Sequence, residues 1–158
     1  MSIKKRAFYF FCACCLLFSL VGCGKKEDTT LADGMFLMLS STVKGEAVET
    51  YEMYTLHAEI SDNGNVRIYA DDFNRWVPSD PCPEETVQLS ADTIQQIKDL
   101  IDEIDLYHMR RNIGSRDLKD GEYKELTLYT ASGEHVSGGL NPSNREFLKL
   151  YDYVEDQI

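Results

Sequence analysis

Residues able to carry out metal or acid–base chemistry are few and scattered in this sequence. The three histidines, His57, His108 and His135, lie far apart along the chain. Zinc sites take histidine and cysteine ligands at short, recurring spacings, and no such spacing occurs here. We therefore predict no metal site and expect the histidines to be ordinary strand or loop residues.

Two pairs of adjacent acids, Asp71 with Asp72 and Glu84 with Glu85, resemble the carboxylate pair of a glycoside hydrolase only superficially. Neighbouring strand residues point to opposite faces, and 27 acidic residues make such pairs common by chance. The acidic turns at 61–65 and 117–122 lack the alternating ligands of a calcium loop. No nucleophile, phosphate or dinucleotide motif is present, so we expect neither an enzyme nor a cofactor.

The aromatic residues are the most distinctive group, with nine tyrosines and a single tryptophan. Tyrosine combines contact area with a hydrogen-bonding tip, which suits binding to proteins, peptides or sugars. Strand alternation places several tyrosines on one face of the predicted sheet, and the tryptophan falls in the 73–85 loop. The alternative is that loops or the first strand cover this face and that the tyrosines are packing residues. The predicted binding residues are Tyr51, Tyr69, Trp76, Tyr123 and Tyr129.

Alternating apolar residues predict the strands that carry these side chains. Candidate strands cover 34–42, 51–61 and 66–73, with a hairpin turn over Asp62 to Asn65, where Asn and Gly tolerate positive φ. A second hairpin is expected from 122–131 and 135–140. The sheet face opposite the apolar one should carry Met53, His57, Arg67, Tyr69, Glu125, Thr127 and Tyr129.

Two amphipathic helices follow the hairpins. Ser90 is the expected N-cap of the first, and Ser143 with Glu146 forms a Ser-x-x-Glu capping box for the second. Their expected buried stripes are Ile94, Ile97, Leu100, Ile101 and Ile104, then Phe147, Leu150, Tyr151, Val154 and Ile158. We predict an α+β fold: a two-layer antiparallel sheet of about five strands with both helices on one face, in which the hairpin–helix unit occurs twice.

The N-terminus has the features of an export signal. Lys4, Lys5 and Arg6 precede sixteen apolar or small residues, Ala7–Gly22, which is short of the roughly 20 that cross a bilayer. The sequence LVGC, Leu20 to Cys23, resembles the lipobox of bacterial lipoprotein signal peptides. That resemblance implies cleavage after Gly22 and a diacylglyceryl group on Cys23. An uncleaved anchor helix and an ordinary secretory peptide are the alternatives.

The expected organisation is a cleaved lipoprotein signal peptide at 1–22, a lipidated N-terminus and tether at 23–33, and one α+β domain at 34–158. In architecture alone this resembles small lipoproteins of Gram-positive bacteria that have no assigned function. Two acyl chains are enough for stable anchoring, so we expect a protein on the extracytoplasmic face of the cell membrane.

Charge and cysteine content limit the partners. Loss of the three basic residues of the signal leaves 13 basic and 27 acidic residues, a net charge of −14, which disfavours nucleic acid. Beyond Cys23 only Cys82 remains, between Pro81 and Pro83, and we expect it to be incidental. The expected partners are the membrane, through Cys23, and an envelope protein or glycan. A non-enzymatic binding module is favoured over a structural or assembly subunit and over an envelope hydrolase.

Overall fold

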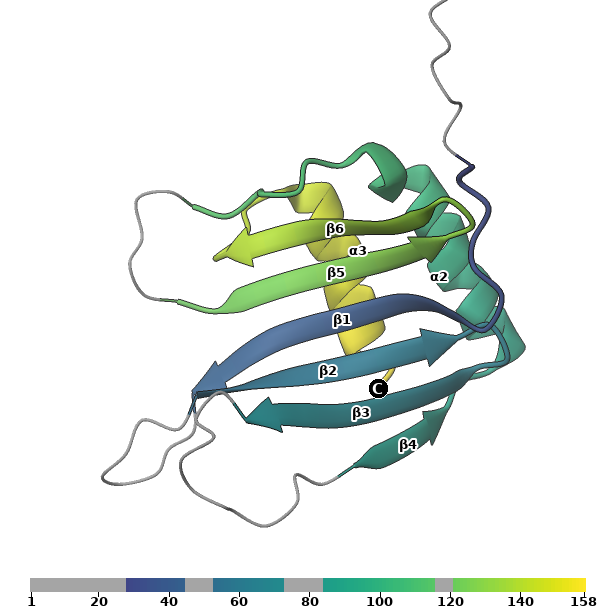
Figure 1. Cartoon of the computed structure of the whole chain (residues 1–158), viewed down its shortest axis with the longest axis horizontal. Coiled ribbons are helices and arrows are strands. Elements are labelled where there is room, and N and C mark those ends of the chain that lie inside the picture. The colour runs from purple at the N-terminus through teal and green to yellow at the C-terminus, as the bar shows by residue number, and fades with distance from the viewer. Residues whose placement is uncertain (1–27, 45–52, 73–83, 116–120) are drawn as a thin grey trace, which may run out of the picture.

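The computed structural model describes residues 28–44, 53–72, 84–115 and 121–158 (Figure 1). These form an α+β fold with one antiparallel sheet of six strands and two α-helices. The strands are β1 (Met35–Lys44), β2 (Met53–Ser61), β3 (Asn65–Asp72), β4 (Glu85–Gln88), β5 (Tyr123–Thr130) and β6 (Gly133–Leu140). The helices are α2 (Ala91–Glu103) and α3 (Arg145–Glu155), with a single 3₁₀ turn, η1 (Leu106–His108).

The strand order is β4-β3-β2-β1-β5-β6, so β1 joins the two hairpins by pairing with β2 on one side and β5 on the other. The sheet has one strand more than the five or so predicted. That strand is β4, which pairs with β3 over four residues. It follows a proline-rich stretch and has almost no apolar alternation, so its sequence carries little strand signal.

The turn between β2 and β3 confirms the predicted hairpin. Gly64 has a φ of 84°, a left-handed backbone conformation that residues with a side chain rarely adopt. A Cβ at Gly64 would also lie 2.5 Å from the carbonyl oxygen of Leu89. The backbone N–H of Leu89 donates to the Gly64 carbonyl at 2.8 Å. This hydrogen bond therefore also positions the segment that connects β4 to α2.

The two helix starts have different outcomes. Ser90 caps α2 as predicted, and its hydroxyl accepts a hydrogen bond from the N–H of Thr93 at 3.1 Å. The prediction of a capping box at Ser143 is wrong, because α3 begins at Arg145, one residue later than that box requires. Its N-cap is Asn144, whose side-chain oxygen accepts from the N–H of Phe147 at 3.0 Å. Both residues can cap a helix, and the point where the backbone enters helical geometry selects between them.

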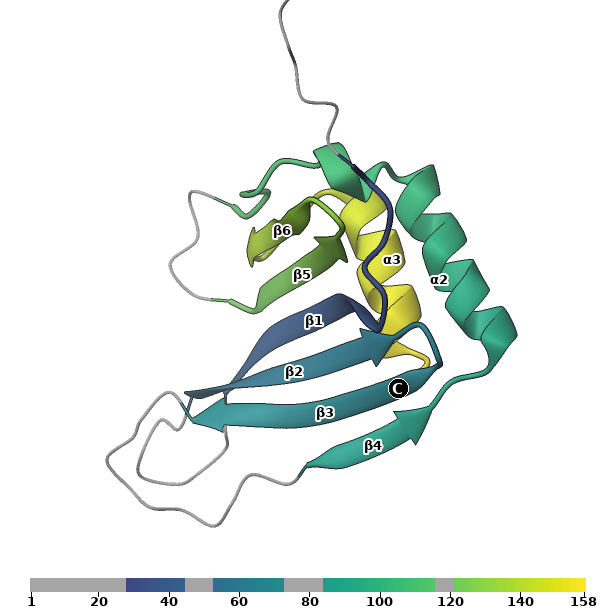
Figure 2. The ribbon, with the colours of Figure 1, turned by 45° about the vertical axis from the view of Figure 1, so that its right-hand side comes forward.

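Buried residues of the strands and of both helices form one core, and Figure 2 shows α2 and α3 side by side next to the strands. Alternate strand residues supply one half of it, namely Leu37, Leu39, Ala58, Ile60, Val66, Leu126 and Leu128, all buried. The predicted helix stripes supply the other half, with two differences. Leu100 is only partly buried, and Ile158 lies beyond the end of α3 and is 36% exposed. Ile158 is therefore not a core residue.

Candidate functional site

The strand residues that alternate with the core residues form a second surface, here called the polar face. Strand register sets Ser40, His57 and Tyr69 beside one another across β1, β2 and β3. The Ser40 hydroxyl and His57 Nδ1 are hydrogen bonded at 2.9 Å. The rings of His57 and Tyr69 have centroids 5.1 Å apart. Side chains from three neighbouring strands therefore contact one another on the polar face.

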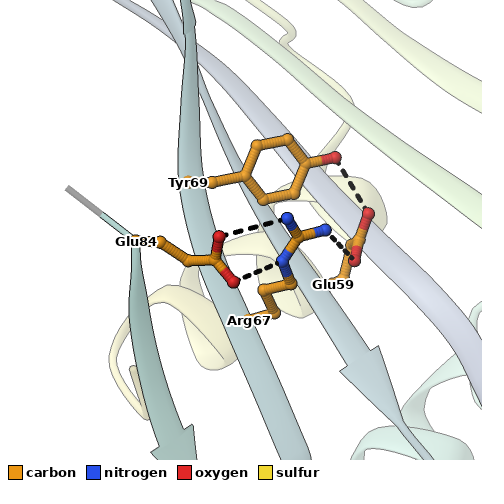
Figure 3. A network of polar contacts seen from close by, with 4 residues as sticks. All are labelled: Glu59, Arg67, Tyr69 and Glu84. Carbon is orange, nitrogen blue, oxygen red and sulfur yellow. Dashed lines mark hydrogen bonds and ion pairs between the residues drawn. The ribbon is translucent and has the colours of Figure 1, made fainter. Parts of the chain in front are cut away.

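Next to this row, four residues form a connected network (Figure 3). Arg67 donates through Nε and Nη2 to the two carboxylate oxygens of Glu84, at 2.8 and 3.2 Å. The same guanidinium lies 3.5 Å from Glu59 and 4.6 Å from the centre of the Tyr69 ring. The Tyr69 hydroxyl donates to Glu59 at 2.8 Å.

The contacts within this network affect the ionisation of Glu84 and limit how far Tyr69 can contact a ligand. Hydrogen bonding to Arg67 lowers the pKa of Glu84 below its usual range, so the Glu84 carboxylate stays ionised near neutrality. The bond of Tyr69 to Glu59 and the guanidinium over its ring engage both parts of the tyrosine that a ligand would use. Tyr69 therefore acts first as a packing residue of the sheet face.

A hollow of about 580 Å³ lies near the other end of the polar face, and is called here the Arg111 hollow. It is lined by residues with hydrogen-bonding side chains, by three glycines and by Leu140. The lining includes Arg111, Asn112, Ser115, Tyr123, Glu125 and Gly138. Tyrosine, carboxylate and guanidinium groups thus face one concave surface, an arrangement that is common in binding sites.

The tyrosine and the acid of this hollow form a direct pair. Tyr123 is 37% exposed, and its hydroxyl donates to a carboxylate oxygen of Glu125 at 2.6 Å. Partial burial, followed by this bond, raises the pKa of Tyr123 to about 12, while the nearby charge of Arg111 acts in the opposite direction. No side-chain hydrogen bond or ion pair engages Arg111 within the part of the chain that the structure describes.

Backbone pairing and glycines create the hollow. The segment 111–115 runs beside β6, where the N–H of Ile113 donates to Gly138 at 2.9 Å and that of Gly138 donates to Arg111 at 3.0 Å. A Cβ on Gly138 would lie 2.4 Å from the carbonyl oxygen of Lys124, and one on Gly114 would lie 2.6 Å from the N of Leu140. Glycine at these two positions therefore lets β6 approach β5, and lets the segment 111–115 approach β6, this closely.

The structure separates the predicted binding residues. Tyr69, Tyr123 and Tyr129 all lie on the polar face, but Tyr69 belongs to the Arg67 network and Tyr123 to the hollow. Tyr129 is half-buried on β5, and its pKa is raised first by burial and then by nearby glutamates. It lies about 20 Å along the strand from Tyr123. Tyr51 and Trp76 fall outside the described residues, as do Cys23 and Cys82.

The contribution of Arg111, Asn112 and the glycines to this hollow was not predicted. Arg111 and Asn112 come from a segment after η1 that has no helical or strand pattern of its own. The only sequence signal was the pair Gly138–Gly139 in a strand, which often marks close backbone approach.

The three histidines occupy separate environments. His57 bonds Ser40 on the polar face, whereas His135 Nε2 is hydrogen bonded at 2.9 Å to the carbonyl of Met109. His108 is exposed beside Asp105. In the described ranges no three or more His, Cys, Asp or Glu residues are grouped so that they could hold a metal ion.

No model of a known protein family matches this chain, and no curated protein matches it either. Among the residues that the structure describes, no helix is long and apolar enough to cross a membrane.

Proposed function

We propose that this protein is an extracytoplasmic lipoprotein, held on the cell membrane by a diacylglyceryl group on Cys23, whose domain binds a protein or glycan of the envelope. LVGC and the basic and apolar stretches before it support the anchor. Two acyl chains hold a protein stably on a bilayer. The domain then needs no membrane contact of its own, which agrees with the mature net charge of −14.

The observation that carries the binding role is the Arg111 hollow. No side chain among the described residues pairs with its guanidinium, which can bind a carboxylate or carbonyl of a ligand. The Tyr123–Glu125 pair, 2.6 Å apart, offers an acceptor beside an exposed ring. Peptides and glycans present donors, acceptors and flat apolar surfaces together, so this combination fits them. The proposal takes both helices to cover one face of the sheet and the polar face to be open to partners.

Within the set Tyr51, Tyr69, Trp76, Tyr123 and Tyr129, the geometry favours Tyr123 as the principal contact. Tyr69 is held by Glu59 and Arg67, and Tyr129 is half-buried. Tyr123 combines the greatest exposure of the three with a position at the rim of a hollow.

Site-specific photo-crosslinking in the native membrane tests the binding role. A photoreactive amino acid replaces Tyr123 in the full-length protein, and the control carries it at Asp99, an exposed residue of α2. We expect a discrete crosslinked species from position 123 that weakens when Arg111→Ala is added, and none from position 99. Equal products at both positions, or none at position 123, would contradict this site.

Mass spectrometry of the purified protein tests the anchor separately. We expect a first residue of Cys23 carrying the diacylglyceryl group, and we expect Cys23→Ser to leave the precursor uncleaved. An intact Met1 in the wild type, or an unmodified Cys23, would overturn the lipoprotein assignment without affecting the binding site.

A further inference from the structure

A second concave surface lies on the opposite side of the sheet, beside the C-terminal end of α3, and is called here the α3 groove. Its volume is about 350 Å³, and Leu56, Ala58 and Ile68 face it from the strands, with Tyr151 and Ile158 on the other wall. Three large apolar side chains stand out as exposed among the described residues, and two of them, Leu56 at 37% and Ile158 at 36%, line this groove. Apolar exposure gathered in one concave place marks an interaction site more strongly than scattered residues do.

The groove exists because α3 ends at Glu155 and leaves the helix-side surface of β2 and β3 partly uncovered. Figure 1 shows the C-terminus close to these strands. Its size is at the lower end of the range for ligand pockets, which is enough for one or two apolar side chains.

The rim of the groove is acidic. Glu85 and Glu155 line it directly. Among the residues that the structure describes, Lys124 brings positive charge to this rim, and its ammonium lies 3.8, 3.6 and 3.5 Å from Glu122, Asp152 and Glu155. A single ammonium near three carboxylates leaves a net negative charge beside the groove, and Glu85 adds a further negative charge.

We propose that the α3 groove binds a basic amphipathic segment of a partner protein. An apolar side chain of that segment enters between Leu56, Ala58 and Ile68, and a flanking Lys or Arg pairs with Glu85 or Glu155. Charge complementarity identifies the occupant, because an acidic rim on a mature chain of net charge −14 attracts a cationic segment. The same charge opposes a second copy of this chain. This site is independent of the Arg111 hollow, which lies on the polar face.

The test measures binding of a defined probe to the mature lipidated protein in detergent. The probe is a short fluorescein-labelled peptide of lysine and leucine with its leucines on one helical face, followed by fluorescence anisotropy. Two reference peptides replace all leucines with serine or all lysines with glutamate. We expect binding of the lysine–leucine peptide only, weakened by added salt as pairing of exposed charges requires.

Variants locate the site. Leu56→Gln should weaken binding by about tenfold, typical for loss of an anchor contact, while circular dichroism confirms the fold. Glu85→Gln with Glu155→Gln should weaken binding and reduce its salt dependence. The matched controls are Met38→Gln, at a partly exposed apolar residue on the polar face, and Glu134→Gln with Glu146→Gln, the same charge change elsewhere. Both controls should bind as the wild type does.

Three results would overturn the proposal. One is an equal loss of binding in the Glu134/Glu146 control, which would make the attraction nonspecific. Another is unchanged binding in Leu56→Gln. The third is self-association in analytical ultracentrifugation that Leu56→Gln abolishes, which would make a second copy the occupant.

Discussion

The N-terminus of α3 allows a sharp comparison between two adjacent residues. Asn144→Ala removes the acceptor for the Phe147 N–H, which it bonds at 3.0 Å. Loss of such a cap costs about 1 kcal/mol, within a range of roughly 0.5 to 2. Because α3 supplies Phe147, Leu150, Tyr151 and Val154 to the core, this cost should reduce the stability of the whole domain. For a domain of this size we expect the melting temperature to fall by about 3–5 °C.

Ser143→Ala is the matched control, since Ser143 is exposed and does not cap the helix. It should change stability by roughly 0.5 kcal/mol or less. Both variants would be compared by thermal unfolding followed by far-ultraviolet circular dichroism, and by urea unfolding. A larger loss from Ser143→Ala than from Asn144→Ala would refute the reasoning and restore the capping box. A double variant no weaker than Asn144→Ala would show that Ser143 does not take over as the cap.

Three further predictions concern the two binding surfaces. Gly138→Ala should destabilise the domain by about 1–3 kcal/mol in urea unfolding, because its Cβ would lie 2.4 Å from the Lys124 carbonyl; wild-type stability would show that the strands can separate freely. In an ultraviolet titration Tyr123 should ionise near pH 12, and Glu125→Gln should lower that pKa by removing the bonded carboxylate; an unchanged pKa would argue against the pair. Lys124→Met should cost about 1 kcal/mol, because Lys124 lies 4.5 Å from the Tyr151 ring, and should tighten binding of the lysine–leucine peptide, because Glu155 loses its counter-charge.

The raised tyrosine pKa values also predict how stability changes in alkali. Burial raises the pKa of Tyr107 and of Tyr123 to about 12, above the ordinary value of 10. The folded protein therefore holds these protons more tightly than the unfolded chain does. This contribution to stability is complete below about pH 10 and is lost as the pH rises towards 12. Urea unfolding across that interval should show falling midpoints, and a flat profile would contradict the burial of these rings.

Periodicity was a sound guide wherever an element buries a long apolar face. The Asp62–Asn65 turn and the Ser90 cap follow from local sequence, as do both helix stripes except for Leu100 and Ile158, and the structure confirms them. Short or irregular segments were harder to predict. β4 has only four residues, and its pairing with β3 depends on tertiary contacts more than on its own pattern.

The candidate site was predictable only in part. Alternation placed Tyr69, Tyr123 and Tyr129 on one face, because successive strand residues point to opposite sides. Strand alternation does not predict which side chains contact each tyrosine ring. The guanidinium over Tyr69, the carboxylate at Tyr123 and the segment 111–115 come from distant parts of the chain.

The sequence by itself determined the α+β class, both helices, the main hairpins and the net charge, because these depend on local pattern and composition. Lipidation of Cys23 is a further prediction from the sequence. Only the tertiary structure decided that Asn144 caps α3, that Ile158 lies outside the core, and that Arg111 and Tyr123 line the same hollow. Those outcomes depend on where the helices end and how closely strands approach, which is set by packing between residues far apart in the chain.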